Sequence, residues 1–222
     1  MSYTVARLAD VLADSVSWLS VRTAGRSGTV PGAEWVSCAQ LIAEQQAGGD
    51  PTASWRAAAA ADYARDYAIE PPVQVAAMFT LMWYLQVPSL VAAVISAATG
   101  FSPEVSPAAL AFRRHPVAHY PAEVALLSQE VVPVEVAAAQ HEAHVRAFLD
   151  SYRPGVKLGS LQRFGAVGDE VRAALRLVED GPYVERAAAA FGVSLDQKLR
   201  ASCCYFYVLP NVTACTTCPR FR

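Results

Sequence analysis

Apolar residues recur at helical spacing along most of the chain. The first such segment runs from about Val5 to Val21, and one face of the expected helix carries Leu8, Val11, Leu12, Ser15 and Leu19. The polar residues 2–4 are suited to cap its N-terminus. Similar patterns predict helices over 35–46, 53–67, 73–86, 89–98, 133–151 and 184–192. Another helix is expected within 157–178, where Gly165 and Gly168 interrupt the pattern. The body of the protein is therefore expected to be mainly α-helical.

One stretch in the middle of the chain has a different pattern. Residues 107–115 and 118–127 have the composition of two strands joined by a turn at His115-Pro116. We expect a small β-hairpin or small antiparallel sheet there, and no parallel sheet. The predicted fold class is mainly α (α+β), with a helical body, this β element and a C-terminal cysteine-rich segment. Residues 22–32, rich in Gly, Ser and Thr, are expected to form a loop.

The most apolar part of the chain raises the question of a membrane span. Residues 75–95 form a run of 21 residues without a charged side chain, which is long enough to cross a bilayer. Gln86 and Pro88 lie near its middle, and proline disfavours helix at the preceding residue. We interpret the run as two buried helices that meet near Pro88, with a lipid-facing segment as the alternative. Peripheral association with a membrane is compatible with either interpretation.

Composition narrows the classes of partner and compartment. The chain has 222 residues, a net charge of -2 and 17% charged residues, so no global basic field favours nucleic acid. Its length suits one domain or a domain and a half. Asp10 and Asp14 interrupt any apolar core of a signal peptide at the N-terminus. We therefore expect a cytoplasmic protein.

Four of the five cysteines lie close to the C-terminus. Cys203, Cys204, Cys215 and Cys218 have the spacing C-C-x10-C-x2-C, which suits a metal ion, an iron–sulfur cluster or two disulfides. The adjacent pair departs from the usual spacing of an all-cysteine zinc site, and disulfides need an oxidising compartment. Because neighbouring side chains of a strand point to opposite faces, we expect a helix end or tight turn at Cys203. Cys38 stands alone and is interpreted as a small core residue.

This tail resembles the C-terminal signature of FhuF-type ferric-siderophore reductases. The similarity extends from Arg200, three residues before the cysteine pair, through Tyr207-x-Leu209-Pro210 to Pro219. The resemblance implies that Cys203, Cys204, Cys215 and Cys218 bind a [2Fe-2S] cluster. It also implies a ferric siderophore as substrate, a helical body over 1–195 with a cleft for it, and a cluster-binding segment over 196–222.

Two other functions remain open at this stage. The protein could be a non-catalytic iron–sulfur electron carrier or sensor, or a binding module stabilised by zinc. A reductase without flavin or nicotinamide needs an electron donor protein such as a ferredoxin or a reductase. The chain contains no GxxxxGK and no GxGxxG motif, so bound nucleotide cofactors are not expected.

Basic residues bracket the cysteines. Lys198, Arg200, Arg220 and Arg222 contrast with the acidic net charge of the whole chain. They can offset the negative charge of a cluster with four thiolates, or recruit an anionic siderophore complex or redox partner. Arg200 and Arg220 are the candidates for substrate or partner docking. Residues 194–200 are expected to form a capped turn of helix that ends at the cysteines.

The four histidines offer a weaker signal. His141 and His144 are three residues apart on a predicted helix, a spacing that could place two metal ligands on one side. We interpret them as ordinary histidines on a helix surface. His115 and His119 lie in the expected hairpin and are interpreted as structural or solvent-facing.

Overall fold

The computed structural model describes residues 3–24, 32 and 34–221 and confirms a mainly α fold of the α+β class. Its helices are α1 (Val5–Ser15), α2 (Cys38–Gln46), α3 (Ala53–Tyr67), α4 (Val73–Ser89), α5 (Ile95–Thr99), α6 (Val134–Ser151), α7 (Ser160–Arg176) and α8 (Val184–Ala190). Its strands are β1 (Ser20–Thr23), β2 (Val36–Ser37), β3 (Phe101–Pro103), β4 (Leu110–Arg114), β5 (Pro121–Leu126) and β6 (Val131–Pro133). Most of the loop expected at 22–32 lies outside the described residues.

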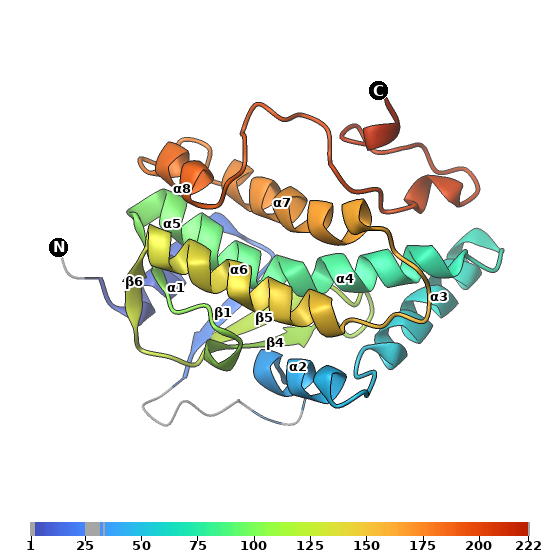
Figure 1. Cartoon of the computed structure of the whole chain (residues 1–222), viewed down its shortest axis with the longest axis horizontal. Helices are drawn as coiled ribbons and strands as arrows, with labels where there is room; N and C mark the ends of the chain where they lie inside the picture. The colour runs from blue at the N-terminus through green and yellow to red at the C-terminus, as the bar shows by residue number, and fades with distance from the viewer. Residues whose placement is uncertain (1–2, 25–31, 33, 222) are drawn as a thin grey trace.

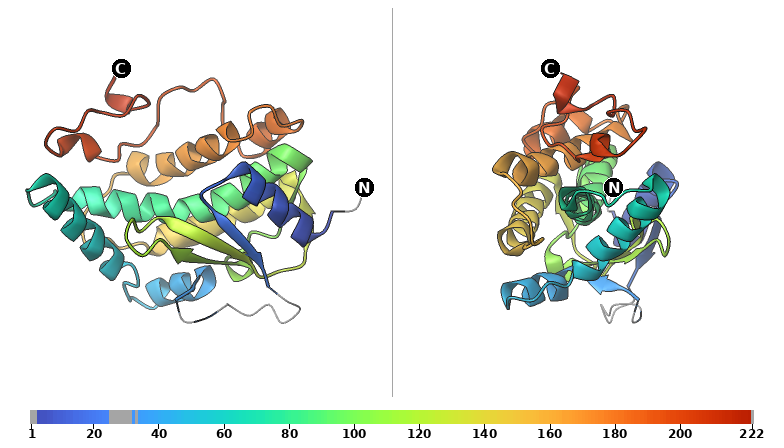
Figure 2. Two further views of the ribbon diagram at one scale, coloured as in Figure 1. Left: turned by 180° about the vertical axis from the view of Figure 1, so that it is seen from behind. Right: turned by 90° about the vertical axis from the view of Figure 1, so that its right-hand side faces the viewer.

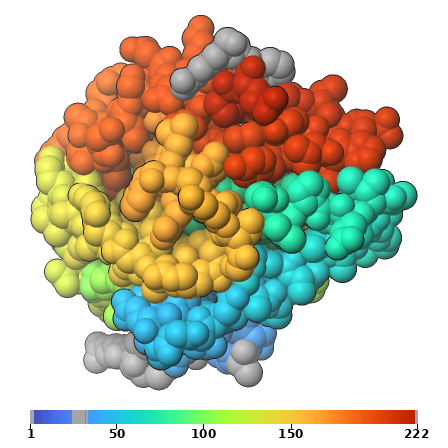
Figure 3. All heavy atoms as spheres, turned by 45° about the vertical axis from the view of Figure 1, so that its right-hand side comes forward, coloured from blue at the N-terminus to red at the C-terminus, as the bar shows by residue number. Residues whose placement is uncertain are grey.

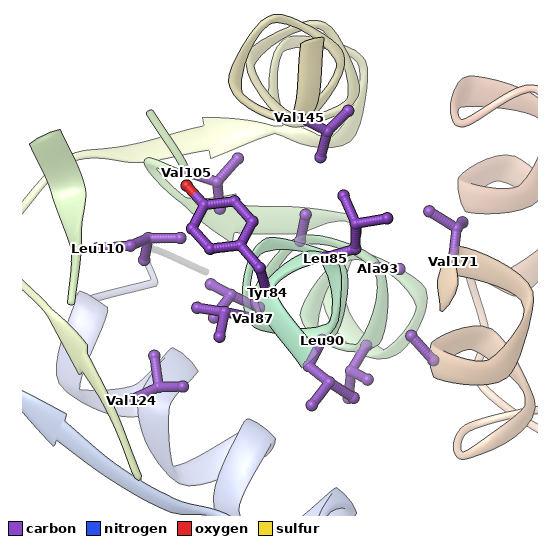
Figure 4. Packing of buried hydrophobic residues seen from close by; sticks show 14 of the residues in the cluster. Tyr84, Leu85, Val87, Leu90, Ala93, Val105, Leu110, Val124, Val145 and Val171 are labelled. Carbon is purple, nitrogen blue, oxygen red and sulfur yellow. The ribbon is translucent and has the colours of Figure 1, made fainter. Parts of the chain in front are cut away.

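The molecule is built around one long central helix. Figures 1 and 2 show α4 and α5 running through the middle, with α6 and α7 along one side and the sheet with α1 on the other. Figure 4 shows Tyr84, Leu85 and Leu90 of this helix among side chains from the sheet, α6 and α7. A helix that is apolar all round must be covered by the rest of the protein, and most of this helix is buried, although Phe79, Met82 and Trp83 on one face stay partly exposed.

The central helix corrects the prediction of two helices that meet at Pro88. Helical backbone is continuous from Val73 to Thr99, with Pro88 inside α4 and a π-helical turn at Leu90–Val94 joining α4 to α5. Proline has no backbone N–H, so one hydrogen bond of the α-helical pattern is missing at Pro88. The π-helical turn that follows has i→i+5 hydrogen bonds, and with this change of pattern the helix continues past the proline. Gly100, with φ of 79°, then ends it in the left-handed region.

We expect the protein to be recovered in the soluble fraction without detergent. Val73–Thr99 is long and apolar enough to cross a membrane, but 78% of its most apolar window is buried inside the protein. That burial already removes the apolar surface from water, which leaves little for lipid to cover. Fractionation of expressing cells by ultracentrifugation tests this expectation. Recovery only in membranes that high salt does not strip would contradict it.

The sheet is larger than the predicted hairpin and it is mixed. The hairpin itself is confirmed, because β4 and β5 pair antiparallel on either side of the turn. The full order is β1-β5-β4-β2, and β1 pairs parallel with β5 from Ser20↔Glu123 to Thr23↔Leu126. The prediction of a small antiparallel sheet, with no parallel strands, was therefore wrong for β1. Helix α1 also ends at Ser15 instead of about Val21, because the following residues supply this edge strand.

Two further local predictions differ from the structure. Gly165 and Gly168 lie inside α7 and do not interrupt it. Residues 194–200 form turns and no helix. The expected cap at the first helix is confirmed, since the Thr4 hydroxyl accepts a hydrogen bond from the amide of Arg7 at 3.3 Å.

The paired histidines of α6 are core residues, which corrects their interpretation as surface residues. His144 is fully buried; its Nε2 lies 2.8 Å from the Tyr84 hydroxyl and its Nδ1 lies 2.8 Å from the carbonyl oxygen of Val105. His141 Nε2 lies 3.0 Å from the Ser89 hydroxyl. Burial lowers the pKa of His141 to about 3 and that of His144 to about 4, so both rings are neutral. They tie α6 to the central helix.

Candidate functional site

The cysteine-rich tail forms a separate layer on the helical body. After α8 the chain runs back along α7 and ends above α3 and the start of α4 (Figure 1). Figure 3 shows this C-terminal segment, in red, covering the face next to α3 and α4. Short 3-10 turns at Phe206–Val208 and Pro219–Phe221 are its only regular structure among the described residues. Its position therefore depends on contacts with the body.

Asp169 of α7 is the main anchor of the segment. Its carboxylate accepts hydrogen bonds from the amides of Ala201 and Ser202, both at 2.8 Å, and from the Ser202 hydroxyl at 2.6 Å. It also forms an ion pair with Arg172, and both side chains are buried. A carboxylate that accepts several short bonds in a buried site holds its partners tightly. The two residues before Cys203 are thereby fixed on α7.

Arg200 links the two halves of the cysteine motif. Its guanidinium pairs with Glu170 at 3.1 Å and lies 3.5 Å from the Asp169 carboxylate. Its backbone amide donates to the carbonyl oxygen of Thr217 at 2.7 Å. The backbone bond closes the segment into a loop, because Thr217 lies between Cys215 and Cys218. One residue thus joins α7, the vicinal pair and the C-x-x-C turn.

Gly165 permits the close contact between α7 and the segment. A Cβ at this position would lie 3.1 Å from the Cβ of Ala201 and 3.4 Å from its backbone. A side chain here would force the segment to shift by a few tenths of an ångström. The glycine that looked like a helix interruption in the sequence is a contact point for the segment.

The chain bends at residues 201–202, just before the vicinal pair, and again at Tyr205, just after it, whereas the sequence predicted a helix end or tight turn at Cys203 itself. Tyr205 has φ of 62°, a left-handed conformation, and the 3-10 turn begins at the next residue. Phe206 then packs edge-on against Tyr63, Tyr67 and Phe79, with ring centroids 5.5–5.9 Å apart. This aromatic contact fixes the bend against α3 and α4.

The second pair forms a tight turn of its own. The amide of Cys218 donates to the carbonyl oxygen of Cys215 at 2.9 Å, and the Thr217 hydroxyl lies 3.8 Å from the Cys215 sulfur. Such a turn directs both sulfurs of a C-x-x-C pair to one side. Cys218 is buried, whereas Cys215 is exposed.

All four cysteines line one cavity of about 590 Å³, which we call the cysteine cavity. Arg200 and Phe79 contribute to its wall. Among the described residues, no three His, Cys, Asp or Glu side chains are arranged to hold a single metal ion. A [2Fe-2S] cluster is ligated by four thiolates shared between two irons, so the sulfurs surround a larger object than one ion. The donor type, number and common cavity fit such a cluster.

Burial disfavours the thiolate form of the vicinal cysteines, and two nearby arginines oppose that effect. Burial raises the pKa of the Cys204 thiol, and the Phe206 amide and the Arg200 guanidinium oppose that rise. Burial likewise raises the pKa of Cys203, opposed by the Tyr205 amide and by Arg220. Each vicinal sulfur therefore has its own arginine.

Arg220 differs from Arg200 in how firmly it is held. Its guanidinium donates to the Tyr207 hydroxyl at 2.8 Å and lies over the ring of that tyrosine, 4.3 Å from the centroid. Arg220 is exposed, whereas Arg200 is largely covered by its two carboxylate partners. Of the four basic residues flagged in the sequence, Arg222 lies outside the described residues. A docking role for Arg200 and Arg220 stays a prediction.

The family comparison points to the same segment. Residues 200–220 match the family model described as the FhuF 2Fe-2S C-terminal domain, so the resemblance to that family is confirmed for this part of the chain. The cofactor of the segment is a [2Fe-2S] cluster. No curated protein matches the chain.

Sequence reasoning missed the residues that hold the segment in place. Asp169, Glu170 and Arg172 are all buried, although they are charged residues of a helix. The signal in the sequence was the run Gly165-x-x-Gly168-Asp-Glu-x-Arg172, which combines small residues with dense charge. Nothing in that run identifies its partners, which lie more than thirty residues further along the chain.

Neutralising the two arginines separately is expected to give different results. Arg220→Gln should lower the reduction potential of the cluster by roughly 20–40 mV, because the more negative reduced state loses a nearby cation. Its thermal stability should hold. Arg200→Gln should lower the potential and also destabilise the protein, since Glu170 loses its partner. Redox titration and thermal unfolding of both variants test this.

The same variants also test docking. If the arginines recruit an anionic partner, the salt dependence of ferric-siderophore reduction should flatten in the variants. An unchanged potential, rate and salt slope in both would leave the arginines without a role in redox chemistry or docking.

Proposed function

We propose that the protein is a ferric-siderophore reductase, in which a C-terminal [2Fe-2S] cluster reduces Fe(III) to Fe(II) in a siderophore complex. The observation that carries the proposal is the gathering of four cysteines around one cavity, in a segment that matches a 2Fe-2S domain. We propose Cys203, Cys204, Cys215 and Cys218 as the cluster ligands. Residues 196–222 would form the cluster-binding segment and 1–195 the siderophore-binding body.

The chemistry requires one electron and no covalent change in the siderophore. Iron(III) is a hard cation that siderophore oxygens bind tightly, and iron(II) suits those oxygens much less well. A [2Fe-2S] cluster, when bound, supplies one electron at a time. The electron enters from a donor protein such as a ferredoxin or a reductase, and it leaves on the iron of the substrate. The product is Fe(II), which the siderophore releases.

The chain's own residues set the position of that exchange. Cys215 is exposed, so its side of the cavity is open to a docked donor or substrate. Asp169 and Arg200 hold the segment on α7, and Phe206 fixes the bend beside the vicinal pair. We propose a cytoplasmic location for the exchange. Nucleic acid and a membrane span form no part of the proposal.

Anaerobic mixing tests the function. The purified protein is reduced with dithionite, freed of excess reductant and mixed with ferric hydroxamates and ferric catecholates. We expect the visible spectrum of the oxidised cluster to return when the ferric complex is added. At the same time a colorimetric Fe(II) chelator should report one Fe(II) for each electron that the cluster loses. The Cys203→Ser variant is the matched control and should release no Fe(II).

Two results would overturn the proposal. A reduced protein that no ferric complex reoxidises, but that an electron-transfer protein does, would be a carrier or sensor. A colourless protein containing zinc and no iron would be a zinc-stabilised module.

A further inference from the structure

A second cavity lies next to the cysteine cavity, and the cluster chemistry does not use it. It has a volume of about 400 Å³ and is lined by four aromatic side chains, Trp18, Phe79, Trp83 and Tyr120, together with Met82. We call it the aromatic cavity. Its rings come from α4, the α1–β1 connection and the β4–β5 turn region, so it exists only in the folded protein. Trp18, 40% exposed, keeps it accessible from solvent.

The two cavities share a wall. Phe79 lines both of them. The ion pair between Arg200 and Glu170 is divided in the same way, because Arg200 lines the cysteine cavity and Glu170 lines the aromatic one. A ligand in the aromatic cavity would thus be separated from the cysteines by little more than one layer of side chains.

The lining includes polar groups that suit a ligand. The Oε1 atom of Gln86 is buried without a hydrogen-bond partner in the described part of the chain, and Gln86 lines the cavity. An unpartnered buried amide oxygen is costly, and a ligand N–H or O–H would satisfy it. Glu170 is the one charged residue of the described lining, and it is buried. Gln86 and Glu170 thus belong to the same lining as the rings, and Glu170 is already paired with Arg200.

The charges of this lining select the ligand. The described lining contains no lysine or arginine, and aromatic ring faces carry negative electrostatic potential. Because Glu170 is paired with Arg200, the rings set the charge preference: four ring faces without a cation in the described lining disfavour a polyanion and favour an apolar molecule that is neutral or carries one positive charge. A ferric chelate with the metal enclosed by neutral donors has that character, whereas a ferric tris-catecholate is a trianion.

We propose that the aromatic cavity is the substrate site, and that it takes ferric chelates with no net charge or a single positive charge. The inference rests on the proposed reductase function and names the site at which that function takes place. Trp18 and Trp83 pack against the chelate, and Gln86 accepts a hydrogen bond from it. Phe79 separates the chelate from the cysteine cavity, across which the electron passes.

Gallium(III) complexes test binding apart from reduction, because gallium(III) matches ferric iron in charge and coordination and does not accept the electron. The probes are the gallium complexes of a neutral trihydroxamate and of a tris-catecholate, titrated into the whole cluster-loaded protein by calorimetry. Trp18→Ala and Trp83→Leu each remove one aromatic wall. Tyr183→Ala removes an aromatic side chain of the same 40% exposure outside the cavity and is the matched control.

We expect the trihydroxamate complex to bind the wild type and Tyr183→Ala equally, and roughly tenfold more weakly to each tryptophan variant. The KM for the ferric trihydroxamate should rise by the same factor, while the cluster spectrum and potential stay unchanged. Unaltered binding and KM in both tryptophan variants would overturn the site and leave the reductase function standing. Tighter binding of the tris-catecholate complex would overturn the assigned charge.

The two proposals fail separately. Trp-sensitive binding of the gallium complex, without reduction of the ferric complex, would support the cavity as a binding site and overturn the reductase function. Normal reduction of the ferric complex, with gallium binding that neither tryptophan variant weakens, would support the reductase function and overturn the aromatic cavity as the substrate site.

Discussion

Replacing any one of Cys203, Cys204, Cys215 or Cys218 with serine is expected to remove most of the visible absorbance of the purified protein. All four side chains line the cysteine cavity, in the segment that matches a 2Fe-2S domain. Serine offers a hard hydroxyl where iron needs a thiolate, and one missing ligand leaves one iron incompletely held. We expect a loss of roughly tenfold or more in cluster occupancy. Iron and sulfide analysis with visible spectroscopy measures it.

Cys38→Ser is the matched control for these four variants. Cys38 is fully buried in the core cluster of the body, and burial raises the pKa of its thiol to about 12. Cys38 does not line the cysteine cavity, so it is not placed to bind the cluster. The variant is expected to lose stability, by about 1–3 kcal/mol for the buried hydroxyl, and to keep its absorbance per folded molecule. A bleached Cys38→Ser beside a coloured Cys203→Ser would reverse the ligand assignment.

Removing the Asp169 carboxylate should release the cluster segment from the body. Asp169→Ala deletes three hydrogen bonds to residues 201 and 202 and leaves Arg172 buried without its partner. Loss of one member of a buried ion pair costs about 3–5 kcal/mol. We expect a lower urea midpoint, faster proteolysis after α8 and faster loss of iron to a chelator.

Two further variants separate charge from geometry at this position. Asp169→Asn keeps the shape and one acceptor oxygen, so it should weaken the segment less than alanine does. Glu142→Gln breaks an exposed ion pair with Arg146 on α6 and is the control, with an expected change within about 0.5 kcal/mol. If Asp169→Ala matched that control in stability and in iron retention, the carboxylate would not be the anchor.

The cluster segment illustrates what sequence reasoning could reach at the site. The spacing alone left a metal ion, a cluster or two disulfides open, and the family resemblance of residues 200–219 implied the [2Fe-2S] cofactor, which the family match confirms. The geometry of adjacent side chains predicted a helix end or tight turn at Cys203, whereas the left-handed residue of the structure is Tyr205, two positions later. The aromatic cavity could not be predicted from the sequence. Its wall combines Trp18, Phe79 and Tyr120, which lie far apart in the chain and meet only in the folded protein.

Local pattern determined the helices of the body. Helix α3, helix α6 and the hairpin of β4 and β5 occur where periodicity and turn residues placed them, since each of these depends on interactions between neighbours in the chain. The same reasoning failed at Pro88. A proline usually ends a helix, but here the neighbouring elements bury most of the central helix, and a π-helical turn keeps it continuous.

The sequence by itself determined the helical class, the hairpin and the four-cysteine motif, because each depends on residues near one another in the chain. The tertiary structure decided the rest. Strand β1 pairs with β5 about a hundred residues away, and His144 is buried because Tyr84 and Val105 meet its ring. Asp169 holds residues 201 and 202 from a helix that ends long before them. The free energy of such contacts depends on which surfaces the folded chain brings together, and no local pattern records that pairing.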